Sequence, residues 1–153
     1  MLNRDLLLRI LDDAYERKAW HGTNLRGSLR GVTADEALWR PAPGRHNIWE
    51  LAVHCAYWKY AVRRKLTGEK RGSFARKGSN WLPPGEKWED DVRMLGREHR
   101  ALRSAIEKAT PQQLTKLERL IYGVAAHDAY HTGQIQLIKK LRGRDGRRGR
   151  SKA

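Results

Sequence analysis

The chain has 153 residues, of which 39% are hydrophobic and 32% charged, a length and composition that suit one domain with a single hydrophobic core. No run of about 18 apolar residues occurs, which excludes a membrane-spanning helix, and the single cysteine, Cys55, excludes an internal disulfide framework and favours the cytoplasm. The formal net charge of +15 suggests a polyanionic partner, but residues 59–77 and 139–153 each carry +7, so the remainder of the chain is nearly neutral.

A first helix is predicted over roughly residues 3–20. Its apolar side chains recur at helical spacing on one face: Leu6, Leu7, Ile10, Leu11 and Ala14. The segment carries acids and has no small-residue cleavage site, so we expect no signal peptide. Gly22 and Gly27 then break the pattern. A short helix is predicted in "TADEALW", where Thr33 and Glu36 have the spacing of a capping box, and the prolines of "RPAPG" end it.

The second long helix begins at "NIWE", with Asn47 as the N-cap and Glu50 at the third helical position. Its predicted core stripe steps by three or four residues: Leu51, Cys55, Trp58, Val62 and Leu66. Thr67 and Gly68 close the helix. Residues 68–86 are rich in glycine, proline and cations and predict a long loop, which in compact domains is often functional or partly disordered.

The third long helix has the most regular pattern, the a/d spacing of a bundle seam: Trp88, Val92, Leu95, His99, Leu102 and Ile106. Thr110 and Pro111 start a fourth helix, which is predicted to run to about residue 141. Its inner face is predicted from the same spacing: Leu117, Leu120, Val124, His127, His131, Ile135 and Ile138. Four amphipathic helices joined by one long loop predict an all-α fold, a four-helix bundle.

The last residues, "RGRDGRRGRSKA", contain three glycines and no apolar residue except the final alanine. Such a segment cannot contribute a core face. We therefore expect residues 1–142 to form one domain and residues 143–153 to be a disordered basic tail. Contacts between the cations of this tail and phosphate groups predict only weak, non-specific polyanion binding.

Three histidines form the candidate site. His127 and His131, in "AAHDAYHTGQI", are neighbours on one helical face, with Cβ atoms about 5–6 Å apart. Such a pair alone is more typical of interior histidines that hydrogen-bond to carboxylates or carbonyls than of metal ligands. His54 adds a third imidazole, in the apolar context "LAVHCAYW" of the second long helix. Three inward histidines on two helices predict a divalent-metal site with open coordination positions, as in catalytic sites.

The other polar residues have simpler interpretations. His99 is interpreted as a satisfied interior or seam-edge histidine, and His21 as a helix-end partner or a residue at a pocket mouth. Cys55 is predicted to be a small core residue rather than a ligand. Asp128 faces about 100° away from His127 around the helix and would orient a ligand only from a neighbouring turn. Gly133 is interpreted as a position of close helix packing. No general base is identified.

Six tryptophans are many for a chain of this length. Three lie on predicted helical faces and are expected in the core: Trp49, Trp58 and Trp88. Three others flank predicted loops, where they either pack or line a cavity: Trp20, Trp39 and Trp81.

The stretches "ALWRPAPGRHNIWELAVHCAYWKYAVRRKL" and "YGVAAHDAYHTGQIQLIKKL" resemble the DinB-like (YfiT-like) family over roughly residues 5–142. The resemblance implies a four-helix bundle, usually dimeric, that holds a divalent ion, typically zinc or nickel. The implied ligands are His54, His127 and His131. Some members look like transferases or isomerases that use a low-molecular-weight thiol, which the metal binds and deprotonates.

The expected function is therefore a metal-dependent, thiol-using transferase or hydrolase that acts on a small-molecule substrate as a homodimer. The alternative is a non-enzymatic bundle that binds nucleic acid or another polyanion through the basic loop 68–86 and the tail. A bundle without any chemistry, whose histidines are structural, also remains open at this stage.

Overall fold

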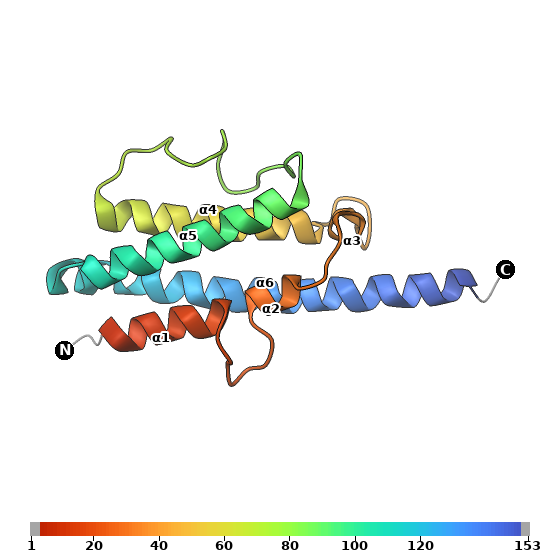
Figure 1. The fold of residues 1–153 in the computed structure, drawn as a ribbon, viewed down its shortest axis with the longest axis horizontal. Helices are drawn as coiled ribbons and strands as arrows, with labels where there is room; N and C mark the ends of the chain where they lie inside the picture. Colours follow the sequence, from red (N-terminus) through yellow and green to blue (C-terminus); the bar gives the residue numbers. More distant parts are fainter. Residues whose placement is uncertain (1–3, 151–153) are drawn as a thin grey trace.

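The computed structural model describes the backbone of residues 4–150 and the side chains of residues 4–143. Four long helices are present: α1 (Arg4–Tyr15), α4 (Ile48–Thr67), α5 (Trp88–Lys108) and α6 (Pro111–Arg150), together with the short helices α2 (Leu25–Leu29) and α3 (Ala34–Leu38). Helix α6 runs along the length of the molecule (Figure 1) and packs against α1 and α4, whereas α5 packs mainly against α4 and also contacts α1. The chain is thus an all-α bundle, as predicted.

The predicted ends of α4 are confirmed. The Asn47 side chain accepts from the backbone N–H of Glu50 at 2.8 Å, and Glu50 accepts from the backbone N–H of Asn47 at 3.3 Å. Such a capping box satisfies two backbone donors that the helix leaves unpaired. Gly68 ends the helix at φ +73°, a left-handed conformation that glycine adopts without steric cost. Thr33 and Glu36 form the predicted capping box of α3.

The N-terminal segment differs from the prediction. Helix α1 ends at Tyr15, not near residue 20, because the Asp12 carbonyl accepts from both Glu16 and Arg17 and so closes the last turn. Gly27, expected to break the helix, instead lies inside α2, which Asn24 caps by accepting from the Gly27 N–H at 2.7 Å. On α1 itself Leu8 is buried, whereas Leu6 is 50% exposed.

Helix α6 continues to Arg150, nine residues beyond its predicted end near residue 141. The prediction of a disordered tail over 143–153 stays a prediction, because the side chains after Gly143 and the whole of residues 151–153 lie outside the described residues. No helix within residues 4–150 is both long enough and apolar enough to cross a membrane.

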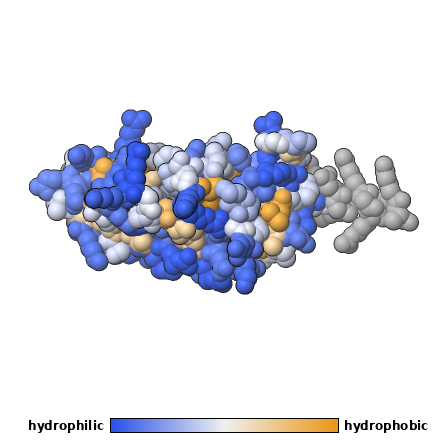
Figure 2. All heavy atoms as spheres, turned by 90° about the horizontal axis from the view of Figure 1, so that it is seen from above, coloured by the Kyte–Doolittle hydropathy of each residue, from blue (hydrophilic) through white to orange (hydrophobic). Residues whose placement is uncertain are grey.

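The core confirms most of the predicted stripes and corrects one position. Trp49, Trp88 and Cys55 are buried, whereas Trp58, expected in the core, is 38% exposed on the outer side of α4. The loop between α4 and α5 arches over α4 (Figure 1) and is anchored by two buried side chains, Phe74 and Leu82. Seen from above, this side of the molecule is mostly hydrophilic, with small separate hydrophobic patches (Figure 2). The loop is therefore part of the packed structure.

Candidate metal centre

The packing of α4 against α6 brings the three predicted histidines together. The Nε2 atom of His127 lies 3.0 Å from Nε2 of His54 and 3.0 Å from Nε2 of His131. Their ligand atoms all fall within 4.8 Å of one another. Both His54 and His131 are 4% exposed. Three ring nitrogens from two helices thus converge on one point.

Hydrogen bonds at the far side of two rings set their tautomers. His54 donates from Nδ1 to the backbone carbonyl of Asn80 at 3.0 Å, and His131 donates from Nδ1 to Oε1 of Gln134 at 2.6 Å. We assign the protons to Nδ1 because a carbonyl oxygen only accepts. The Nε2 atoms of both rings therefore present lone pairs to the centre, as in metal sites whose ligands are oriented from behind.

His127 completes the set. Its Nδ1 is buried and has no hydrogen-bond partner among the described residues. If the His127 proton is on Nε2, it can be donated to Nε2 of only one of the two neighbouring histidines, and the lone pair of the other stays without a donor. If the proton is on Nδ1, the Nε2 lone pairs of all three histidines face one another. Either arrangement leaves acceptors without a donor, so the histidines do not satisfy one another by hydrogen bonds alone. The donor set therefore fits a cation.

Burial also holds these imidazoles neutral. It lowers the pKa of His54 to about 4 and the pKa of His127 to about 3, and it lowers the pKa of His131 as well. Near neutral pH the lone pairs are consequently available, which metal binding requires. Two of the three nitrogen pairs, at 3.0 Å each, have the close spacing that nitrogens bound to one ion require.

Two residues of the long loop cover the site, and sequence patterns did not reveal either role. Asn80 holds His54 through its carbonyl and Trp58 through Oδ1, which accepts from the indole N–H at 3.0 Å. Its φ of +61° is a left-handed conformation that asparagine tolerates better than most residues. Trp81 stacks on the His54 ring at 3.8 Å and also on His46 at 3.6 Å. The one sequence signal was the position of Trp81 beside a loop.

His46 is fixed between Trp81 and α4. Its Nδ1 lies 3.0 Å from Oε2 of Glu50. Arg40, from the "WRPAPG" segment, pairs with the same Glu50 carboxylate. This segment therefore wraps the start of α4 and supports the tryptophan that covers His54.

Asp128, considered as a group that orients a ligand, has another partner. It forms a fully buried ion pair with Lys59. Burial raises the pKa of the Asp128 carboxyl, and the Lys59 ammonium opposes this change. The Asp128 carboxylate thus links α6 to Lys59 of α4. Cys55 is fully buried and burial raises its pKa well above the ordinary value, so it is an inert core residue as predicted.

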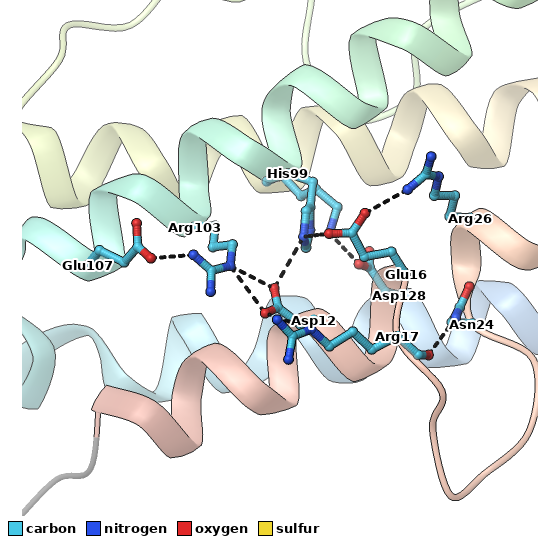
Figure 3. Close-up of polar contacts among 10 residues, drawn as sticks. Asp12, Glu16, Arg17, Asn24, Arg26, His99, Arg103, Glu107 and Asp128 are labelled. Carbon is cyan, nitrogen blue, oxygen red and sulfur yellow. Dashed lines mark hydrogen bonds and ion pairs between the residues drawn. The ribbon is translucent and has the colours of Figure 1, made fainter.

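A second group of potential ligands, Asp12, Glu16 and His99, lies where α1 faces α5 (Figure 3). His99 is interior as predicted, stacked on Tyr15 at 4.0 Å. Neither ring nitrogen makes a hydrogen bond among the described residues, although Nε2 lies 3.5 Å from Oδ1 of Asp12 and 3.8 Å from Oε1 of Glu16 (Figure 3). Burial and nearby cations, Lys59 first among them, lower its pKa to about 3.

The carboxylates of this second group already have cationic partners. Arg103 donates from Nε to both oxygens of Asp12 at 3.1 Å, and Arg26 donates to Glu16 at 2.9 Å (Figure 3). A positive surrounding of this kind disfavours another cation. We therefore take the three histidines alone as the candidate metal centre.

An apolar groove of about 290 Å³ reaches this centre. Its walls come from α4 and α6, and His127 forms part of its lining: Trp58, Ala61, Val62, Lys65, Arg119, Leu120, Gly123, Val124 and His127. Pockets that bind small ligands are of this size and are mostly apolar. His21, which is exposed and six residues beyond the end of α1, lines two other surface pockets, so the pocket-mouth interpretation is the one confirmed.

A family model described as the DinB superfamily matches residues 18–135, which include all three histidines. No curated protein and no solved structure matches the chain significantly.

Proposed function

The chain belongs to the DinB superfamily, and from that premise we propose that His54, His127 and His131 hold one divalent ion, zinc or nickel, in an enzyme that acts on small molecules. The observation that carries this proposal is the convergence of three Nε2 atoms, with that of His127 3.0 Å from each of the other two, while acceptors at Nδ1 orient the His54 and His131 rings. The pKa values of the imidazoles keep them in the form that binds a metal.

The reaction class that fits is a transfer or hydrolysis with a low-molecular-weight thiol as cosubstrate. A divalent ion supplies Lewis acidity, which lowers the pKa of a thiol or water that it binds. Three protein ligands leave coordination positions free for such a group. The protein's own contribution is to orient His54 and His131 and, through the stacked Trp81, to shield the His54 side of the centre from water.

The apolar groove is the proposed substrate site. It has an apolar floor of Val62, Leu120 and Val124, and His127 connects it to the centre. Lys65 and Arg119 also line it, and neither forms an ion pair with the described residues. An apolar molecule that carries a negatively charged group matches this lining.

Elemental analysis of the purified protein tests the metal assignment. We expect about one divalent ion per chain, retained in His21→Ala, which removes an exposed histidine outside the site, and lost in His54→Ala and in His131→Ala. Stoichiometric metal in a protein that lacks both His54 and His131 would refute the assignment.

A thermal shift experiment with a thiol then tests the reaction class. Glutathione should raise the melting temperature of the zinc-loaded protein, because a ligand at a hundredfold excess over its Kd adds about 2.7 kcal/mol to the stability. It should leave the melting temperature of His54→Ala unchanged, because that variant lacks a proposed metal ligand. An equal shift in both proteins would show that the thiol binds elsewhere.

A further inference from the structure

A second pocket, of about 610 Å³, lies between α4 and the first half of the loop that follows it. Five of its lining side chains are cationic, and none is acidic: Arg64, Lys65, Arg71, Arg76 and Lys77. We call it the basic pocket. Its aromatic part is formed by Tyr57, Trp58 and Phe74, with the Tyr57 and Phe74 rings 5.6 Å apart in an edge-to-face contact. Positive charge beside aromatic surface suits a ligand that carries an anionic group on an aromatic or apolar body.

Three of the five cations have no partner within the described part of the chain. Arg76 pairs with Asp91, and Arg64 donates to the backbone carbonyl of Glu69 at 3.5 Å. Lys65, Arg71 and Lys77 form neither an ion pair nor a hydrogen bond there. The only acid of residues 59–77 is Glu69, and Arg63 binds its side chain. Like charges gathered in one hollow repel one another, and an anion removes that cost.

The basic pocket is joined to the groove that reaches His127. Trp58, Ala61 and Lys65 line both hollows, and their spacing of three and four residues places them on one exposed face of α4. Lys65 lies about 16 Å along the helix from His54. The shared face of α4 therefore provides a continuous path from the histidines to the unpartnered cations.

We infer that the basic pocket binds the carboxylate or phosphate of a small organic anion whose apolar part lies along Trp58, in the groove that leads to His127. This assignment of the substrate class rests on the proposed function for the role of the histidines, whereas anion binding itself depends on Lys65, Arg71 and Lys77 and requires no metal. Charge holds one end of the molecule, and the aromatic and apolar surface holds its body.

Calorimetric titration of the metal-free full chain with four probes tests the inference. Phenyl phosphate and benzoate carry both a ring and a charge, inorganic phosphate only the charge, and benzyl alcohol only the ring. Phenyl phosphate or benzoate should bind at least tenfold more tightly than either partial probe, and the stronger of the two identifies the anion. Failure of both charged aromatic probes to bind would overturn the inference.

A matched pair of triple variants locates the site. Lys65→Gln with Arg71→Gln and Lys77→Gln removes the three unpartnered cations, and Lys18→Gln with Arg97→Gln and Lys108→Gln removes three equally exposed cations outside the pocket. We expect at least tenfold weaker binding for the first triple and less than twofold for the second. The charge-preserving changes Lys65→Arg, Arg71→Lys and Lys77→Arg should retain binding. Equal losses in both glutamine triples would mean a net-charge effect and overturn the site.

Two further arms separate this inference from other outcomes. In the His54→Ala/His131→Ala protein, loss of zinc with unchanged binding of phenyl phosphate supports the anion site independently of the metal. Competition by a single-stranded oligonucleotide is the second arm. If the oligonucleotide displaces phenyl phosphate, binds at least a hundredfold more tightly, and has an affinity whose salt dependence corresponds to more than three phosphate contacts, the pocket is a nucleic-acid site and the inference is overturned.

Discussion

Single residues behind the imidazoles define the candidate centre as much as the histidines themselves. Gln134 accepts from His131, and its own amide N–H donates to the Tyr130 hydroxyl at 3.4 Å. The backbone carbonyl of Asn80, in the loop between α4 and α5, likewise accepts a hydrogen bond from His54. Each acceptor fixes a tautomer, so the lone pair at Nε2 points to the centre without a further loss of ring freedom on metal binding.

Gln134→Leu tests this orienting role, because leucine has nearly the same size and cannot accept a hydrogen bond. We expect the zinc affinity at neutral pH to fall about 10–100-fold, measured by competition with a chelator. Gln136→Leu, two residues further along α6 and outside the histidine cluster, is the control. Identical affinities of wild type and Gln134→Leu would show that the tautomer is set elsewhere.

At the scale of elements, α6 is the central helix, and one of its glycines does not have the role that was expected of it. Gly133 was interpreted as a close-packing position, but an added Cβ there would meet no atom within 4 Å. The interpretation is wrong, because residue 133 is exposed on α6, between the buried Thr132 and the half-buried Gln134. A glycine without a packing or conformational reason only weakens a helix.

Gly133→Ala should therefore stabilise the protein, by about 0.5–1 kcal/mol, since alanine restricts the unfolded chain and favours the helix. Gly68→Ala is the matched comparison: its surroundings are equally open, but its φ is +73°. That change should destabilise by about 1 kcal/mol. Urea unfolding measures both, and a destabilising Gly133→Ala would reveal a contact outside the described residues.

The whole molecule contains four imidazoles that burial holds in the neutral form, spread over α4, α5 and α6. The pKa of His99 is about 3 and the pKa of His54 about 4, both below the ordinary value of 6.5. At pH values between these folded-state pKa values and 6.5, the unfolded chain binds more protons than the folded one. Their contribution to stability is consequently complete above about pH 6.5 and is lost as the pH falls through the folded values.

His99→Phe removes one of these titrating groups, because phenylalanine keeps a ring that can stack on Tyr15 and His99 is not one of the proposed ligands. The metal-free variant should lose less stability on acidification than the wild type, by about 1.4 kcal/mol per pH unit between about pH 6 and 4. Urea unfolding across this range gives the slopes, with His21→Ala as the control for removal of an exposed histidine. Parallel curves for wild type and His99→Phe would contradict the low pKa of His99.

Assembly and charge also belong to this scale. The homodimer expected from the family resemblance stays a prediction, as does the cytoplasmic location. The described residues place the unpartnered cations Lys65, Arg71 and Lys77 around one pocket. Part of the positive charge of residues 59–77 is thus gathered around the basic pocket.

The sequence by itself determined the features that depend on neighbours within one turn. The capping boxes at Asn47 and Thr33 and the stop at Gly68 follow from local hydrogen bonds and backbone conformation. The spacing of His127 and His131 placed both rings on one helical face, and His54 was identified by its apolar surroundings. Periodicity failed where exposure depends on other elements, as for Trp58, which has an apolar spacing on α4 and nevertheless faces outward.

Only the tertiary structure decided what surrounds the histidines. The carbonyl of Asn80 accepts a hydrogen bond from His54, which is 26 residues away in sequence, and Lys59 pairs with Asp128, which is 69 residues away. Neither the loop's path over α4 nor the pairing of α4 with α6 leaves a periodic signal, because such contacts arise from the packing of segments that are distant in sequence. The sequence thus identified the ligand candidates, and the packing determined their orientation, their burial and the pocket beside them.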